Sequence, residues 1–191
     1  MGDAQKDRDQ AARLPEGDVV AILLEQHARI RELFGKVKQS SGEQKQKTFD
    51  ELRALLAVHE TAEQMILRPV SADKAGKAEA DARNAEEAEA NKVLSELEKM
   101  DVDSAEFISR LAEFERSVLE HAENEEQQEF PAVRAGCPED QLRKMGSRLQ
   151  SVERMAPTHP HPKVAGSTAA QWLTGPFAAM VDRTKDALSK D

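Results

Sequence analysis

Two histidines of this chain are each followed, four residues later, by a glutamate: His59 with Glu63, and His121 with Glu125. Residues four apart lie on one face of an α-helix. Apolar residues recur at steps of three and four around both pairs, so we expect each pair to point into the protein. These apolar residues are Leu52, Leu55, Leu56 and Ile66 around the first pair, and Phe107, Leu111, Phe114 and Val118 around the second. Because an unpaired charge inside a protein costs several kcal/mol, the two pairs indicate a ligand that they share.

A third histidine and two glutamates extend this pattern to two more helices. His27 falls on a helical stripe made of Val20, Leu23, Leu24, Ile30 and Phe34. On a helix expected over residues 79–100, the apolar side runs through Ala90, Val93, Leu94, Leu97 and Met100, and one turn earlier it reaches Glu86 and Glu87. Glu87 is in slightly better register with this side. The competing interpretation is that both glutamates are solvated charges on the flank of the helix.

Three inward histidines and several inward carboxylates on four helices match the ligands of a dinuclear metal site, in which imidazoles bind single metals and carboxylates bridge the pair. Mixed nitrogen and oxygen ligands without cysteine argue against a structural zinc of the thiolate kind, and the absence of an all-oxygen cage argues against calcium or magnesium. Iron is therefore the expected metal, and manganese is left open. The alternative is that the histidines are hydrogen-bonded core residues. Against it stands the joint placement of three of only 5 histidines with glutamates at matching spacing.

The composition indicates an all-α protein. The chain of 191 residues is 39% hydrophobic and 33% charged, with 9 Gly, 8 Pro and no Tyr, and it contains long runs rich in Ala, Glu, Lys and Leu. Helices are expected over residues 18–38, capped by Asp18, over 44–67, ended by Pro69, over 79–100, and over 103–129, ended ahead of Pro131. Four such helices with short links predict an up-down-up-down four-helix bundle.

We expect this bundle to be a single domain over residues 17–134 with an appendage at each end. Residues 1–16 are polar and aperiodic, which predicts a disordered arm. Residues 135–191 are expected to form a C-terminal helix and an extended tail that pack on the outside of the bundle. The tail carries His159 and His161 between prolines. These histidines can fold back over the bundle mouth and bind a metal, although a surface loop is the commoner place for such a pair.

Charge and cysteine content narrow the classes of partner. A net charge of −9 and a pI near 5.2 argue against a nucleic-acid or membrane partner, because both require a basic surface. The single cysteine, Cys137, excludes an internal disulfide. The chain starts without the apolar core of a signal peptide and has no apolar span of about 20 residues. We therefore expect a cytoplasmic protein with a small-molecule partner.

The order of these motifs resembles the hemerythrin-like family, also called HHE cation-binding domain proteins. The motifs are His27, then the segment from His59 to Glu63, a Glu-rich third helix, and the segment from His121 to Glu125 followed by Phe130-Pro131. The proline-histidine and GPFAAMVDR stretches resemble the tails of bacterial, especially actinobacterial, members. The resemblance implies a four-helix bundle with a non-haem di-iron centre, oxo- and carboxylate-bridged, that binds O2, NO or peroxide. It also implies His27, His59 and His121 as imidazole ligands, and Glu63 and Glu125 as bridging carboxylates.

The chain departs from this family on the third helix, where members usually supply one or two histidines and this chain has none. Either Glu86 or Glu87 takes the place of a histidine, or one metal has an incomplete set of ligands. A substituted centre would be rich in carboxylates, which favour the higher oxidation states of iron. We therefore expect a redox enzyme or detoxifier that reacts with O2 or peroxide. The alternatives are a sensor or carrier module for O2, NO or iron, and a metal-poor structural relic.

Overall fold

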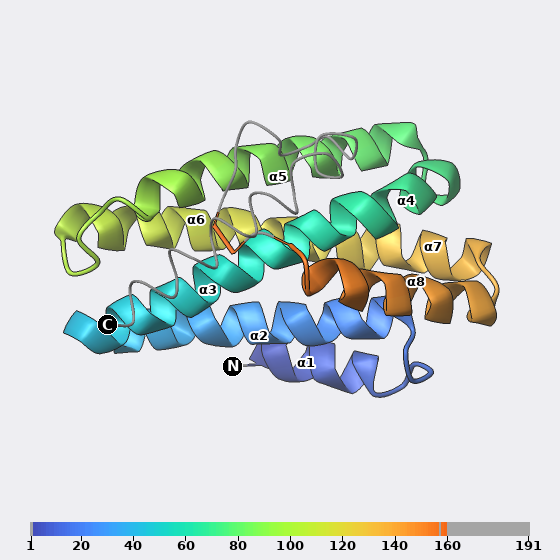
Figure 1. The fold of residues 1–191 in the computed structure, drawn as a ribbon, viewed down its shortest axis with the longest axis horizontal. Coiled ribbons are helices and arrows are strands. Elements are labelled where there is room, and N and C mark those ends of the chain that lie inside the picture. Colours follow the sequence, from blue (N-terminus) through green and yellow to red (C-terminus); the bar gives the residue numbers. More distant parts are fainter. Residues whose placement is uncertain (1, 157, 160–191) are drawn as a thin grey trace.

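The structure, a computed structural model of the chain, describes residues 2–156, 158 and 159. Its framework consists of four long helices that run alongside one another (Figure 1). These are α2 (Val19–Gln39), α3 (Gly42–Ala62), α5 (Lys77–Leu97) and α6 (Ala105–Asn124). The described residues contain no strand, so the predicted all-α four-helix bundle is confirmed. No helix in this part of the chain combines the length and the apolar character of a membrane-spanning segment.

The starts of two bundle helices are fixed by side chains that accept backbone hydrogen bonds. At the start of α2, the carboxylate of Asp18 accepts a hydrogen bond of 2.9 Å from the N–H of Val20, as predicted. At the start of α6, the cap is Ser104, whose hydroxyl accepts a hydrogen bond of 3.1 Å from the N–H of Phe107. Asp103, the expected cap, instead accepts a hydrogen bond from the N–H of Gly42 across the bundle end.

A helix at the C-terminal side covers the outside of the bundle, as the sequence predicts. Helix α8 (Glu139–Glu153) packs against α2 and α3 with its apolar side, formed by Leu142, Met145, Leu149 and Val152. The tail expected after it, including His161, falls on residues 160–191 and lies outside the described residues.

Helix α1 (Gly2–Ala11) occupies the region where the sequence predicts a disordered arm, and that prediction is wrong for these residues. The helix packs along α2, with Ala4 and Ala11 buried. Asp7 is 1% exposed and accepts a hydrogen bond of 2.8 Å from Nε of Arg31. The buried side of α1 consists of small and charged residues, so it leaves no apolar periodicity in the sequence.

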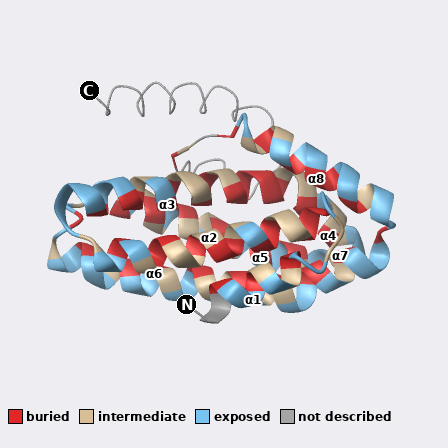
Figure 2. Ribbon diagram, turned by 90° about the horizontal axis from the view of Figure 1, so that it is seen from below, coloured by how far each residue is buried: buried red, intermediate tan, exposed pale blue. Residues whose placement is uncertain are grey.

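The core is divided into two apolar clusters with a polar layer between them. One cluster contains Leu24, Ala62 and Phe130, and the other contains Ile30, Leu56 and Val118. Along α2, α3 and the α6 region, each of the three histidines falls between a residue of one cluster and a residue of the other. Buried residues gather where the helices face one another (Figure 2). The bundle therefore holds its histidines and glutamates in a layer between the two clusters rather than at one end.

Two π-helical segments carry the chain past prolines that the sequence analysis expected to end helices. Segment η1 (Glu63–Leu67) joins α3 to α4 (Arg68–Lys74), and segment η2 (Glu125–Glu129) joins α6 to α7 (Phe130–Gly136). A proline lacks an N–H, and in a regular α-helix its ring collides with the carbonyl four residues earlier. The wider turns, in which Arg68 N–H bonds to Glu63 O and Phe130 N–H to Glu125 O, accommodate Pro69 and Pro131. The helices therefore continue beyond both prolines.

In the second apolar cluster, Phe49 and Phe107 lie several helical turns from the histidines, and a change there should lower stability without altering the polar layer. Phe107 is fully buried and lies edge-on to Phe49, with ring centroids 5.0 Å apart. Phe107→Ala should lower the free energy of unfolding of the metal-free protein by about 3–5 kcal/mol, measured by urea denaturation. The exposed neighbour Ile108 provides the control, because Ile108→Ala should change it by less than about 0.5 kcal/mol. Equal effects of the two changes would contradict this packing.

Candidate metal centre

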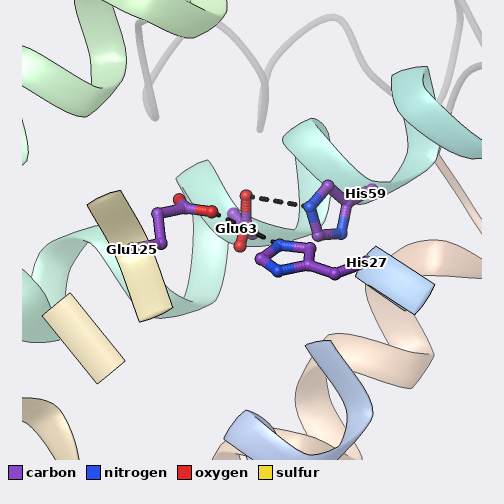
Figure 3. Close-up of side chains that lie close together, drawn as sticks. All are labelled: His27, His59, Glu63 and Glu125. Atoms are coloured by element: carbon purple, nitrogen blue, oxygen red, sulfur yellow. Dashed lines mark ion pairs between the residues drawn. The ribbon is translucent and has the colours of Figure 1, made fainter. Parts of the chain in front are cut away.

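Four side chains from three helical regions meet in the first of two metal-binding arrangements. They are His27 of α2, His59 of α3, Glu63 at the start of η1 and Glu125 at the start of η2 (Figure 3). One ligand atom from each lies within 4.8 Å of the others, and all four residues are buried. Nε2 of His27 lies 3.4 Å from Oε2 of Glu125, and Nε2 of His59 lies 3.4 Å from Oε2 of Glu63. We call this arrangement the first position.

The second position consists of Glu63, Glu87, His121 and Glu125, again with one ligand atom each within 4.8 Å. Nε2 of His121 lies 3.2 Å from Oε1 of Glu125 and 3.9 Å from Oε1 of Glu87. Glu63 and Glu125 belong to both positions. Because the two sets share these carboxylates, Glu63 and Glu125 are placed where they could bridge a pair of metal ions.

Each histidine is held so that Nε2 faces this centre. The Nδ1 atoms lie 2.9 Å from Glu126 Oε1 for His27, 2.7 Å from Gln26 Oε1 for His59, and 2.7 Å from Glu86 Oε2 for His121. An N–H at Nδ1 that donates to such an oxygen leaves the lone pair on Nε2, which is the form that binds a metal. The surrounding residues therefore orient all three imidazoles with Nε2 toward the centre.

Several buried atoms at the centre lack a hydrogen bond of good geometry. They are Nε2 of His27, Nε2 of His121, both carboxylate oxygens of Glu63, and Oε2 of Glu125. An unsatisfied buried polar atom costs about 1–3 kcal/mol, and here they gather in the space between α2, α3, η1 and η2. Imidazole nitrogen and carboxylate oxygen are donors that a divalent transition metal accepts together. The residues present therefore fit a pair of metal ions.

Burial and neighbouring charges shift the pKa values of these groups in opposite directions. Burial, helped by Glu125, raises the pKa of Glu63 well above its usual value. Burial and the nearby His27 lower the pKa of His59 to about 3. Burial also opposes charge on Glu125, but His121 and His27 overcome it and hold the pKa of Glu125 well below its usual value. The centre therefore contains His59 as a neutral imidazole and Glu125 as a carboxylate.

Comparison with known proteins identifies the family and supports the fold. The family model of the hemerythrin HHE cation-binding domain matches residues 18–133. The chain belongs to this family. An uncharacterised hemerythrin-like protein of Schizosaccharomyces pombe is 26% identical over 138 residues, which cover 71% of this chain and 68% of that protein. The crystal structure of a hemerythrin HHE cation-binding domain-containing protein from Mycobacterium kansasii has the same fold, with a TM-score of 0.59. It is 23% identical, and the match covers 84% of this chain and 94% of that chain.

The third helix of this HHE protein brings Glu87, and not Glu86, into the metal-binding arrangement. The side chain of Glu87 is fully buried and belongs to the second position. The side chain of Glu86 is 37% exposed and contacts His121 from behind, at Nδ1. His159, one of the two tail histidines considered, lies at the far end of α5, where its Nδ1 contacts Glu98, and it joins neither position.

The sequence analysis missed Arg68, which lies against the second position. The residue is 2% exposed, and its guanidinium contacts Glu87 and Glu129 and lies 2.9 Å from Oε1 of Glu125. In a regular α-helix, a residue five positions after Glu63 would point about 140° away from it. The π-helical turn rotates Arg68 back toward the carboxylates. The sequence does contain a signal for this turn, because a proline follows both Arg68 and Phe130 at the same distance from each His-Glu pair.

A cavity of about 630 Å³ leads from the surface to the centre. His27, His59, Glu87 and His121 form its inner end, and its apolar wall contains Ile30, Leu56, Val93, Phe114 and Val118. Exposed residues of α5 and α6, including Glu89 and Ser117, line its outer part. A small molecule can therefore reach the histidines between α5 and α6.

If His59 and His121 bind metal, His59→Ala and His121→Ala should each lower the metal content of the purified protein and its melting temperature. The melting temperature falls because bound metal stabilises the folded state by mass action. Elemental analysis and thermal denaturation with and without a chelator measure the two effects. His159→Ala serves as the control and should retain full metal content. Full retention in either of the first two variants would contradict the assignment.

The two adjacent glutamates of α5 predict different outcomes. Glu87→Ala should remove one of two bound metal ions, because it deletes a ligand of the second position. Glu86→Ala should keep both ions at saturating metal, with an affinity lower by about 10–100-fold, since it removes only the partner that orients His121. Metal titration of the two variants separates these outcomes, and equal behaviour would contradict the different placement of the two side chains.

Proposed function

We propose that this protein holds two iron ions between α2, α3, α5 and α6 and uses them to reduce O2 or peroxide, as a redox enzyme or detoxifier. The observation that carries the proposal is the sharing of Glu63 and Glu125 by two adjacent sets of ligand atoms. Manganese is the other metal that this donor set accepts. The hemerythrin-like and cation-binding descriptions of the relatives agree with a metal-dependent role.

The balance of donors supports reduction over reversible binding. The proposed ligands are three imidazoles and three carboxylates, the latter from Glu63, Glu87 and Glu125. Anionic oxygen donors stabilise the higher oxidation states of a metal more than neutral imidazoles do. A bound pair of iron ions supplies the electrons for reduction of a small oxidant. An oxidised pair that is well stabilised favours transfer of those electrons over release of the intact oxidant.

The protein's own residues control binding and access. The Nε2 atoms of His27, His59 and His121 bind the metals, and their partners at Nδ1 keep the rings in place. Glu63 and Glu125 set the distance between the two positions. The apolar wall of the cavity excludes bulk water from the centre while admitting a small uncharged oxidant.

The test is an anaerobic loading followed by exposure to the oxidant. Metal-free protein loaded with ferrous iron should bind close to two ions per chain. Its visible spectrum should change on mixing with O2 and should not return when the solution is purged with argon. A spectrum that returns on each purge would instead show a carrier or sensor, and the reductase proposal would then be withdrawn. No bound iron would indicate a structural relic.

The cavity predicts a change in rate without a change in metal content. Ala90 lines the cavity on α5, whereas Ala112 on α6 is exposed and lies outside it. Ala90→Phe should slow the reaction of the iron-loaded protein with hydrogen peroxide several-fold in stopped-flow measurements, because the ring narrows the route to the histidines. Ala112→Phe adds the same group elsewhere and should leave the rate unchanged. An unaltered rate in Ala90→Phe would exclude this cavity as the route.

A further inference from the structure

The two halves of the bundle contribute equivalent side chains to the centre. The spacing from histidine to glutamate and then to the residue before proline is the same in the segments that start at His59 and at His121. Matching these segments, and the helices that precede them, pairs Gln26 with Glu86, His27 with Glu87, His59 with His121, Glu63 with Glu125, Gln64 with Glu126, and Arg68 with Phe130.

The contacts follow the same correspondence. Gln26 contacts Nδ1 of His59, and Glu86 contacts Nδ1 of His121. Glu126 contacts His27, and Gln64 donates a hydrogen bond to Glu87. The same contacts therefore recur in both halves of the centre, and a residue that differs between the halves can be compared directly with its counterpart.

Four of the six matched pairs differ in residue type, and two of them, His27 with Glu87 and Phe130 with Arg68, are neighbours in space and bring a cation into one half alone. In one half, Phe130 stacks on the imidazole of His27, with centroids 5.5 Å apart and planes 22° apart. In the other half, Arg68 takes the place of Phe130, and Glu87 takes the place of His27. A neutral ligand under an apolar ring is thus replaced by a carboxylate paired with a guanidinium.

This difference changes which ligand atoms are available to a metal. Nη2 of Arg68 contacts Oε1 of Glu87 and lies 2.9 Å from Oε1 of Glu125. These same two oxygens face Nε2 of His121 in the second position. In the first position, Nε2 of His27, Oε2 of Glu125 and both oxygens of Glu63 have no hydrogen bond of good geometry. A metal in the first position meets Arg68 only across the 3.8 Å from Nη2 to Oε2 of Glu63, whereas a metal in the second position competes with Arg68 for the oxygens of Glu87 and Glu125 that the guanidinium contacts.

We propose that Arg68 makes the two metal positions unequal, so that the first fills at low metal concentration and the second binds its ion more weakly and exchanges it more readily. The inference rests on the two-metal centre of the proposed function. Arg68 reduces affinity at the second position because its positive charge already compensates Glu87 and Glu125, and because a metal must take over oxygens that the guanidinium contacts.

Arg68 also explains how the metal-free protein keeps these glutamates buried. Glu63, Glu87, Glu125 and Glu129 are each at most 1% exposed, and Arg68 lies within 4.0 Å of all of them. Buried like charges without a counter-charge would destabilise the fold. Arg68 therefore stabilises the metal-free protein and, for the same reason, lowers the affinity for the second metal ion.

The experiment is a titration of the full-length, metal-free protein with Mn²⁺, with unbound Mn²⁺ measured by electron paramagnetic resonance. The wild-type protein should bind two ions in separate steps. In Arg68→Gln, which keeps a hydrogen-bonding amide but removes the charge, the second step should tighten by about tenfold or more while the first changes little. Arg68→Lys keeps the charge and should retain the separation of the steps. Arg53→Gln is the matched control: Arg53 is also buried, pairs with Asp50 and Glu98 away from the centre, and its loss should leave both steps unchanged.

A second measurement assigns the steps without altering Arg68. Glu87→Gln should remove the weaker step and leave the tighter one, whereas His27→Ala should remove the tighter step. Circular dichroism and the remaining binding step show whether each variant is folded. If Arg68→Gln does not fold, the assignment of the weaker step to the second position by Glu87→Gln and His27→Ala serves as the test.

The outcomes separate this inference from the function on which it rests. Two ions bound with equal affinity by the wild-type protein, a weaker second step in folded Arg68→Gln, or loss of the tighter step in Glu87→Gln would each overturn the role of Arg68 and leave the two-metal centre standing. A wild-type protein that binds at most one ion at saturating Mn²⁺, and also at saturating ferrous iron, would overturn the two-metal centre itself.

Discussion

The structure depends on compensating a group of carboxylates that lie inside a helical bundle. Glu63, Glu87, Glu125 and Glu129 are shielded from water between two apolar clusters, where negative charge is stable only beside positive charge. The guanidinium of Arg68, the imidazoles of His27 and His121 and the proposed metals supply that charge, whereas His59 stays neutral. Attraction between these charges therefore holds the helices together at the polar layer, and the apolar clusters on both sides of the layer hold them together by packing.

Helix geometry determines which residues take part in this compensation. The glutamate of each His-Glu pair is the first residue of a π-helical segment. The wider turn after it accommodates a proline and rotates the next residues toward the centre. Arg68 and Phe130 reach the centre for this reason, so one irregularity of the backbone, repeated in both halves, places the residues that follow each His-Glu pair.

The sequence predicts the parts of this arrangement that follow regular periodicity. His59 with Glu63 and His121 with Glu125 lie four apart on buried stripes, and an α-helical projection is correct up to each glutamate. The projection fails immediately afterwards, which is why Arg68 was missed and why Pro69 and Pro131 were interpreted as helix ends. Helix α1 was missed for a different reason, because Asp7 attaches it by charge rather than by an apolar stripe. The choice between Glu86 and Glu87 required the packing of α5, since adjacent residues on one helix differ too little in periodicity to be separated.

The attachment of α1 links the N-terminal region to the centre. Asp7 accepts a hydrogen bond from Nε of Arg31, Nη2 of Arg31 donates to Oε1 of Glu126 at 3.0 Å, and that same oxygen contacts Nδ1 of His27. A displacement of α1 from α2 would therefore release Arg31 and change the hydrogen bonding behind an imidazole deep in the bundle. A peptide or an affinity tag that is fused at the N-terminus and displaces α1 can therefore alter the electronic properties of the centre without contacting it.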